Sequence, residues 1–139
     1  SIRNNCGFLT RTGPVTGKDK DKLFIQEGRK VFREVSTMVA QMITDNLADN
    51  NLEANGLRGM WLNQANRNMN YFIAKKVLGH DPSDGQQPTV LDQYANTSSA
   101  GSIIAFHKFK SDFEAGDMGV ICSFGAGYSA GSVIVRRAG

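Results

Sequence analysis

The chain is predicted to be an α/β domain, with helices covering a mostly parallel sheet that ends in an antiparallel strand. Apolar residues recur at nearly helical spacing over residues 23–48, and a short apolar run at 60–62 suits a buried strand. Near the C-terminus, two apolar stretches, 118–123 and 132–136, are separated by a glycine turn. Strands joined so briefly pair antiparallel, because a parallel return needs a crossover of a dozen residues or more.

The first half of the chain is expected to pass from loop to helix to strand. Residues 1–22 contain several glycines and an alternating charge run, which is typical of a solvated loop. One long helix is expected over 23–48, with a break at Gly28 as the alternative. It should end in the polar stretch after Ala48, before the strand at 60–62.

The second half is expected to contain two more helices. One begins after Asn63, carries an apolar face and stops at Gly79. After a loop over 81–88, residues 89–91 are a candidate strand. Thr97 or Ser98 should cap a third helix that runs to about residue 113. Four large apolar side chains of this helix are expected to point inward: Ile103, Phe106, Phe109 and Phe113.

Length and composition favour one soluble globular domain. The 139 residues are 40% hydrophobic and 21% charged, enough for a core, and the net charge of +3 is too small for a nucleic-acid footprint. No apolar run approaches a membrane span, and no signal-peptide pattern opens the chain, so a cytoplasmic protein without membrane contact is expected. The first residue is not Met, which leaves a fragment, a processed product or an ordered part as alternatives.

Three polar motifs follow or precede the apolar runs: WLNQAN at 61–66, YANTSS at 94–99 and SFGAGYSAGS at 123–132. Open α/β sheets place ligand sites at the carboxyl ends of their strands. The amides and hydroxyls of these motifs could donate hydrogen bonds to a carbonyl oxygen. The alternative is that Asn63, Asn66 and Asn96 only cap helices and complete turns.

The glycine cluster of the third motif does not have the spacing of a dinucleotide site. Gly125, Gly127 and Gly131 read GxGxxxG rather than GxGxxG, and a strand pattern follows instead of a helix. Nucleotide binding is therefore not expected, and neither a cofactor nor a metal is predicted. A turn whose backbone N–H groups point at one spot can instead stabilise an oxyanion.

Taken together, WLNQAN, YANTSSAGSIIAF and GVICSFGAGYSAGSVIVR resemble the C-terminal half of β-ketoacyl-acyl carrier protein synthase III, in the thiolase-like superfamily. The resemblance covers about residues 24–137 and implies a thiolase-like half fold. It further implies a domain over 23–139, with 1–22 as a linker from an N-terminal half. The implied activity is that of an acyltransferase of fatty-acid biosynthesis, which condenses acyl and malonyl thioesters by decarboxylative Claisen chemistry.

The resemblance also implies roles for individual residues. Asn96 corresponds to the catalytic asparagine, which hydrogen-bonds the malonyl thioester oxygen as charge develops there. Phe124 lies beside the active site, and backbone N–H groups of Gly125 and Ala126 help to hold the acyl-thioester oxygen. The family motif HQAN reads NQAN here, so Asn63 occupies the histidine position. An amide can donate a hydrogen bond there, but it cannot carry positive charge or shuttle a proton.

The nucleophile of the family is a cysteine on the N-terminal half, and no residue of this chain is expected to replace it. Cys122 lies in an apolar strand pattern, and Cys6 lacks the basic or helix-terminal setting that activates a thiol. His80 and His107 fall on unrelated segments and do not restore the missing histidine. The chain alone is therefore expected to be inactive.

The expected partners are an acidic acyl carrier protein, acyl-CoA or acyl thioesters, the N-terminal half and, as in the family, a second copy in a homodimer. Arg67, Lys75 and Lys76 are candidates for carrier-protein docking, with a merely solvated helix face as the equal alternative. Two other functions remain open. One is a non-catalytic module for carrier binding or dimerisation, and the other is an engineered histidine-to-asparagine variant of an active enzyme.

Overall fold

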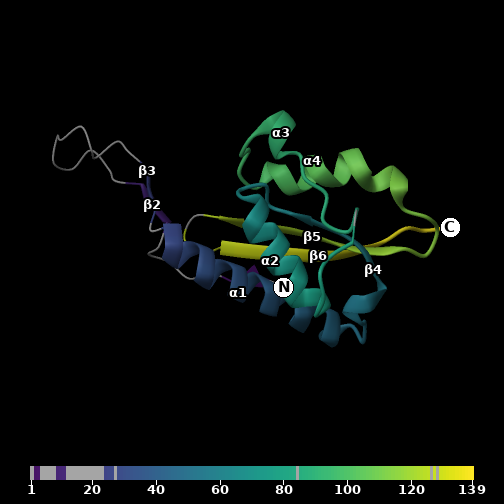
Figure 1. Ribbon diagram of the computed structural model, residues 1–139. Coiled ribbons are helices and arrows are strands. Elements are labelled where there is room, and N and C mark those ends of the chain that lie inside the picture. The colour runs from purple at the N-terminus through teal and green to yellow at the C-terminus, as the bar shows by residue number, and fades with distance from the viewer. Residues whose placement is uncertain are drawn as a thin grey trace, which may run out of the picture.

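The computed structural model describes residues 2–3, 9–11, 24–26, 28–83, 85–125, 127 and 129–139. In this part of the chain a four-stranded sheet, ordered β1-β6-β5-β4, is covered by helices on both faces (Figure 1). Its strands are β1 (Ile2–Arg3), β4 (Leu57–Leu62), β5 (Met118–Gly125) and β6 (Ser129–Arg136). A separate antiparallel pair is formed by β2 (Leu9–Arg11) and β3 (Phe24–Gln26).

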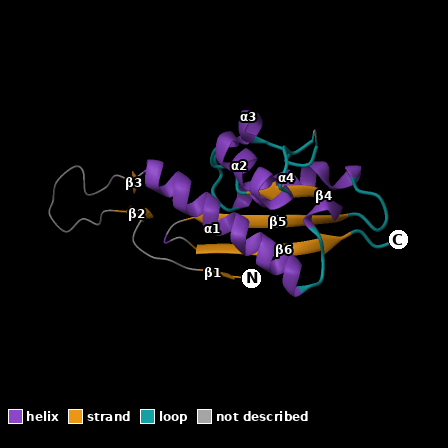
Figure 2. Cartoon of the chain, turned by 60° about the horizontal axis from the view of Figure 1, so that its bottom comes forward, coloured by secondary structure: helices purple, strands orange, loops and turns teal. Residues whose placement is uncertain are grey.

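Two long helices cover one face of the sheet and two shorter helices cover the other. Helices α1 (Gly28–Asp49) and α2 (Arg67–Leu78) pack on the first face, and α1 crosses the sheet in Figure 2. Helices α3 (Leu91–Tyr94) and α4 (Ala100–Phe109) lie on the second. Short 3-10 turns occupy Ala54–Gly56 (η2) and Lys110–Asp112 (η3). Within the described residues, no helix is long and apolar enough to cross a membrane.

The sheet is mixed. Strands β4 and β5 run parallel, with Leu62 opposite Cys122, whereas β5–β6 and β1–β6 pair antiparallel. The prediction of an α/β domain with covering helices and a C-terminal antiparallel strand is confirmed. The sheet is not mostly parallel, however, because β4 and β5 form the only parallel pair among the described strands.

Alternation along the strands divides the core between the two faces. In β4, Met60 and Leu62 pack with α1 and α2, while Trp61 points to the α4 side, because successive side chains of a strand face opposite ways. The Trp61 ring contacts the Phe106 and Phe113 rings at centroid distances of 4.8 and 4.7 Å. A Cβ on Gly119 would lie 2.5 Å from this indole, so only glycine fits beside it.

In the first half of the chain, the structure differs from the predicted loop over residues 1–22 and from the predicted start of the long helix. Residues 2–3 and 9–11 form short strands where loop was expected, and the other residues of 1–22 lie outside the described part. The long helix begins at Gly28, the position at which a break was the alternative, because 24–26 pair with β2 and are not helical. The backbone hydrogen bonds of these residues are used by that ladder.

Other predictions were wrong in the second half. Residues 89–91 do not form a strand, because the Val90 N–H donates to the Gln64 side chain and the Val90 carbonyl accepts from the first turn of α3. Helix α4 ends at Phe109, and its N-cap is Ser99, without a side-chain cap bond. Ile103 is 55% exposed, since the opposite side of α4, with Gly101 and Ala105, faces the sheet. The helix over 67–78 has the expected stop at Gly79.

Candidate functional site

The first and third motifs meet at one edge of the sheet. Because β4 and β5 are parallel, with Leu62 opposite Cys122, Asn63 leaves β4 at the level where Ser123 follows in β5. Strand β6 starts at this same edge, where Ser123 pairs with Gly131 and Gly125 pairs with Ser129. The carboxyl ends of both parallel strands therefore open onto one place, as the sequence predicted for this fold.

The first turn of α4 brings the second motif to the same edge. The Ser123 hydroxyl donates to the Ser99 carbonyl at 3.0 Å, and the Ser102 hydroxyl donates to the same carbonyl at 3.1 Å. The two hydroxyls also lie 2.5 Å apart. These hydrogen bonds join α4 to β5. A cavity of about 380 Å³ lies between the second and third motifs. It is lined by Ser98, Ser99, Ser123, Phe124, Gly125, Ser129, Ala130 and Gly131.

Asn63 is the first residue after β4, and it is buried, with 4% of its surface exposed. Its backbone carbonyl accepts from the Ala65 N–H at 3.1 Å. Its side-chain Oδ1 is buried without a hydrogen-bond partner among the described residues. An unpaired buried acceptor costs about 1–3 kcal/mol, so such an atom calls for a functional or structural explanation.

Asn96 lies on the exposed connection between α3 and α4. Its Oδ1 accepts from the Ser98 N–H at 2.9 Å, which fixes the orientation of the amide and makes Nδ2 the group left to donate. Ala95 and Ser98, which flank the motif asparagine and threonine, have φ values of 54° and 57°. Non-glycine residues in this region are strained by about 1–3 kcal/mol, and such strain clusters at functional sites.

Phe124 and Gly125 end β5 at the cavity. Phe124 is buried and packs in the core cluster shared with α1 and α2, while Gly125 is partly exposed and has open space where a Cβ would lie. Ala126, the other residue predicted for the oxyanion loop, lies outside the described residues. The structure thus places the segments of Asn63, Asn96 and Phe124 at one edge of the sheet.

The sequence patterns did not single out Gln64, although its side chain is fully buried and contacts the end of β4, residues 89–90 and the first turn of α4. Its Nε2 donates to the Leu62 carbonyl at 2.9 Å, and its Oε1 accepts from the Val90 N–H at 3.0 Å and the Thr89 hydroxyl at 3.1 Å. The only sequence signal was its place inside the first motif. A polar residue there is as typical of an exposed loop as of a buried network.

Comparison with known proteins agrees with this geometry. Residues 47–137 match the family described as 3-oxoacyl-[acyl-carrier-protein (ACP)] synthase III C terminal. The chain belongs to this synthase III C-terminal family. It is 53% identical over 137 residues to the β-ketodecanoyl-[acyl-carrier-protein] synthase of Pseudomonas aeruginosa, covering 99% of this chain and 39% of that protein.

Two less similar synthases also match this chain over about two fifths of their own length. A β-ketoacyl-[acyl-carrier-protein] synthase III 1 of Vibrio vulnificus is 30% identical over 131 residues, covering 93% of this chain and 40% of that protein. The crystal structure of 3-oxoacyl-(acyl carrier protein) synthase III from Pseudomonas aeruginosa PAO1 superposes with a TM-score of 0.82 at 20% identity, covering 100% of this chain and 43% of that one. The synthase III domain thus has the predicted thiolase-like fold and spans about two fifths of its relatives' length.

The three basic residues predicted for docking lie on α2, and each has a neighbour within the synthase III domain. Arg67 lies 3.8 Å from the Asp92 carboxylate, and the Lys75 ammonium lies 2.7 Å from the Asp81 carboxylate. Its hydrogen bond to Asp81 raises the pKa of Lys75, and the same bond, with one from Tyr71, lowers the pKa of Asp81. Lys75 therefore stays charged at neutral pH.

The Lys76 side chain points toward α1, in a different direction from the Lys75 side chain. Its ammonium donates to the Thr37 hydroxyl at 3.3 Å and lies 5.4 Å from the centre of the Phe72 ring. Adjacent residues of a helix project in different directions, as expected. The side chains of Lys75 and Lys76 are exposed, but these contacts fix where each charge is presented.

Cys122 is buried on β5, where no base or helix terminus activates it. Burial raises the pKa of its thiol to about 12. Since the thiolate is the reactive form, roughly one thiol in 10⁴ is ionised at pH 8. We expect Cys122 to resist alkylation in the folded synthase III domain and to react only after denaturation, as read by peptide mass spectrometry. Labelling of Cys122 in the folded domain at the rate of a free thiol would contradict this.

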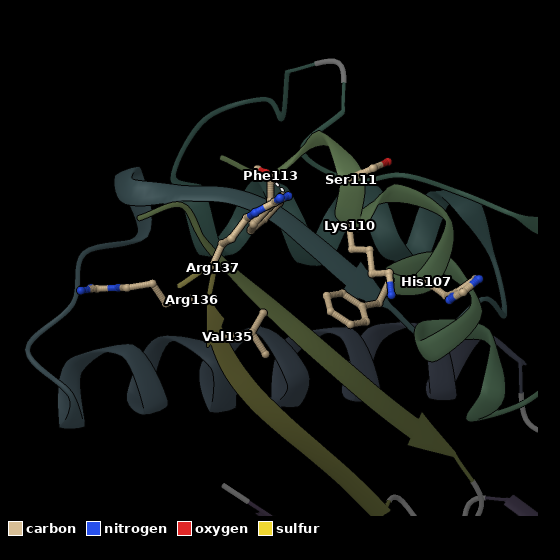
Figure 3. Close-up of a pocket in the computed structure, with 8 residues that line it drawn as sticks. His107, Lys110, Ser111, Phe113, Val135, Arg136 and Arg137 are labelled. Carbon is tan, nitrogen blue, oxygen red and sulfur yellow. Dashed lines mark hydrogen bonds between the residues drawn. The ribbon is translucent and has the colours of Figure 1, made fainter. Parts of the chain in front are cut away.

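A second, larger cavity lies at the opposite end of the sheet. It measures about 440 Å³ and is lined by Phe106, His107, Lys110, Ser111, Phe113, Val135, Arg136 and Arg137. Val135 is paired with Gly119 near the start of β5, far along the strand from Ser123. In Figure 3, His107 and Lys110 belong to the helical side and Arg136 and Arg137 to the strand side. The polar motif segments 61–66, 94–99 and 123–132 contribute no residue to the lining of this cavity.

Neither His80 nor His107 lies at the sheet edge where the three motifs meet. His107 lines the larger cavity, and the exposed His80 lies with Nδ1 2.8 Å from the carbonyl of its neighbour Asp81. The described residues contain no group of three or more His, Cys, Asp or Glu side chains that could hold a metal ion. At the sheet edge where the motifs meet, asparagine amides, serine hydroxyls and backbone N–H groups are able to donate hydrogen bonds.

Proposed function

We propose that this chain is the C-terminal part of a β-ketoacyl-acyl carrier protein synthase III and supplies half of its active site. The reaction is the decarboxylative Claisen condensation of acyl and malonyl thioesters in cytoplasmic fatty-acid biosynthesis. The observation that carries this proposal is the meeting of the three motif segments at one sheet edge, where residues of the second and third motifs, among them Ser98, Ser99 and Phe124, line a cavity. Family membership and the relatives' names support the same activity.

Asn96 and Asn63 stabilise the charge that forms when malonyl thioester loses carbon dioxide. The bond to the carboxylate breaks, and its electron pair moves toward the thioester oxygen as an enolate. Asn96 is suited to donate to that oxygen through Nδ2, because its Oδ1 is already engaged by Ser98. Preorganised donors of this kind contribute strongly to catalysis. Asn63 donates from the histidine position but cannot supply a charge or a mobile proton.

The carbon of the enolate then attacks the acyl group held on a cysteine, and the cysteine thiolate leaves. That cysteine is supplied by the N-terminal part of the protein, since Cys122 is buried with a raised pKa. Backbone N–H groups at Gly125 and Ala126 hold the acyl oxygen during the attack. Phe124, the residue before Gly125, packs in the core cluster with α1 and α2 and so anchors the end of β5.

An acidic acyl carrier protein delivers the malonyl group to α2. Arg67, Lys75 and Lys76 provide the complementary charge, which speeds encounter and sets orientation more than it raises affinity. The ion pairs of Arg67 and Lys75 with Asp92 and Asp81 are exposed and hence weak, so a carrier carboxylate can compete for both cations.

The N-terminal part of the synthase covers the α4 face of the sheet. Two large apolar side chains lie uncovered there, Ile103 on α4 at 55% exposure and Val133 on β6 at 60%. Val133 is on this face because Ile134, its neighbour along the strand, packs into the core with α1 and α2. The same protein forms a homodimer, as its family implies.

Purified alone, the chain is therefore expected to self-associate, because it exposes an apolar face that its own fold does not cover. A double variant, Ile103→Lys with Val133→Lys, should shift it toward monomer in light scattering after size exclusion. Tyr71→Lys is the matched control, since Tyr71 is 43% exposed but lies on α2, on the other side of the sheet. If the unmodified chain stays monomeric and monodisperse at high concentration, the proposal that the N-terminal part covers the α4 face is contradicted.

The proposed activity is tested in a chimera. This chain replaces the matching C-terminal 39% of the Pseudomonas aeruginosa relative, with which it shares 53% identity. Release of carbon dioxide from malonyl thioester is then measured with Asn63 and with the Asn63→His variant. Decarboxylation that the histidine variant raises supports the proposed function, and a chimera that is folded but inactive in both forms overturns it.

One observation favours a second candidate function. The histidine position holds Asn63, and the described part of the chain offers no activated thiol or histidine at the motif edge. The domain would then be a non-catalytic module that binds carrier protein or dimerises. Retention of an acidic carrier protein by a chimera that decarboxylates with neither residue at position 63 would establish this alternative. If Asn63 is an engineered replacement, the histidine variant simply restores the parent enzyme.

A further inference from the structure

Gln64 is buried in a way that its position in a loop does not explain. The side chain is completely inaccessible, although an amide loses free energy on burial unless hydrogen bonds replace those to water. Three hydrogen bonds replace them: one from Nε2 to the Leu62 carbonyl, and two to Oε1, from the Val90 N–H and the Thr89 hydroxyl. A loop amide satisfied so fully is part of the architecture of the site.

The partners of Gln64 lie on the two segments that precede the proposed active-site residues Asn63 and Asn96. Leu62 is the last residue of β4, and Asn63 follows it. Val90 is the N-cap of α3, and its carbonyl accepts from the Gln93 and Tyr94 N–H groups, so it fixes the start of this short helix. Helix α3 ends at Tyr94, two residues before Asn96. Gln64 thus joins the chain just before Asn63 to the element that precedes Asn96.

The first turn of α4 packs on the same side chain. A Cβ on Gly101 would lie 2.7 Å from Cβ and 2.9 Å from Cγ of Gln64, closer than real Cβ contacts allow. One residue later, Ser102 contacts Ser123 of β5, and Ser99 accepts from the Ser123 hydroxyl. Gln64 therefore also sets the distance between the end of β4 and the helix that borders the cavity with Phe124.

From these contacts we infer that Gln64 is a positioning residue, which fixes the Asn63 and Asn96 segments relative to each other without touching substrate. The inference rests on the proposed function, and it adds a residue to which no role had been given. The strained φ values at Ala95 and Ser98 need such a support, because the surrounding structure has to hold a strained backbone in place.

Gln86 provides a matched control at the other end of β4. Its Nε2 donates to the Leu57 carbonyl at 3.0 Å, and its Oε1 accepts from the N–H and the hydroxyl of Ser83, both at 2.9 Å. This repeats the pattern around Gln64: one bond to a β4 carbonyl, one to a backbone N–H and one to a hydroxyl. The two glutamines differ in place, since Leu57 begins β4 and Leu62 ends it.

The test compares Gln64→Met with Gln86→Met in the chimera that carries Asn63→His. Hydrogen exchange of the backbone amides of residues 95–99 should become about tenfold faster in Gln64→Met and stay unchanged in Gln86→Met. The kcat for decarboxylation should fall by on the order of 10²-fold only in Gln64→Met, with KM changed much less, because displaced donors weaken the transition state more than binding.

A milder pair keeps the test decisive if Gln64→Met does not fold. Thr89→Val removes one hydrogen bond to Gln64, and Ser83→Ala removes the corresponding bond to Gln86. Exchange at 95–99 that rises only in Thr89→Val supports the inference. Equal exchange in both members of either pair overturns it. If exchange differs while the chimera with Asn63→His has no activity at all, the proposed function fails and the positioning role stands.

Discussion

Replacing Asn63 with histidine is expected to raise the rate of malonyl-thioester decarboxylation in the chimera by about 10² to 10³-fold, or about 3–4 kcal/mol of transition-state stabilisation. Asn63 stands at the histidine position of the motif and leaves β4 at the edge where the motif segments meet. An imidazole can donate a hydrogen bond, carry charge and move a proton, whereas the amide can only donate. The measurement is release of labelled carbon dioxide under single-turnover conditions.

The Oδ1 of Asn63, which has no hydrogen-bond partner in the described part of the chain, supports this direction. A buried acceptor without a partner is not what an optimised structural asparagine would show, so the replacement sacrifices little stability. Asn63→Gln is the matched control, because it enlarges the side chain and keeps an amide. If glutamine raises the rate as much as histidine does, side-chain volume rather than imidazole chemistry explains the effect, and the assigned role of position 63 is wrong.

The second large effect is expected at Asn96. In the chimera carrying Asn63→His, Asn96→Asp should lower kcat by about 10² to 10³-fold, because a carboxylate cannot donate to the enolate oxygen and repels its charge. The substitution keeps the oxygen that accepts from the Ser98 N–H at 2.9 Å, so the turn before α4 should survive. The loss therefore reports on the Nδ2 donor and not on the turn. Steady-state kinetics of decarboxylation and circular dichroism measure both.

Asn50 offers the corresponding control for Asn96. It is an exposed asparagine at the end of α1, and its Nδ2 donates to the Asn46 carbonyl at 2.7 Å, away from the motif edge. Asn50→Asp removes the same kind of donor and should leave kcat within about twofold, the range expected for surface changes away from a site. Should Asn96→Asp retain the activity of Asn50→Asp, the assignment of Asn96 to the reaction would have to be abandoned.

Much of the fold could be predicted because local patterns decided it. The glycine turn between the last two strands forced them to pair antiparallel, and the helix of α2 has Asn66 as its N-cap and Gly79 as its left-handed stop. The motif segments could be placed at one edge because parallel strands share their carboxyl ends. Burial of Cys122 followed from its place in an apolar strand.

Three of the wrong predictions share a physical cause, because contacts with a distant segment decided the conformation or the burial of the residues concerned. Residues 24–26 pair with β2, and the Val90 N–H binds the Gln64 side chain, so neither segment follows its own apolar pattern. Ile103 is exposed because Gly101, which fits against Gln64, turns the other side of α4 toward the sheet. Such contacts join residues far apart in the chain and leave no local signature.

By itself, the sequence determined which chemical groups this protein brings to a site: asparagine amides, serine hydroxyls and a glycine turn at strand ends, without a histidine at position 63. Only the tertiary structure decided which of them are held together and by what. It made Gln64 the common partner of the segments leading to Asn63 and Asn96, and it paired the cations of α2 with nearby carboxylates. Residue types are encoded locally, but burial and partners arise only when distant segments pack.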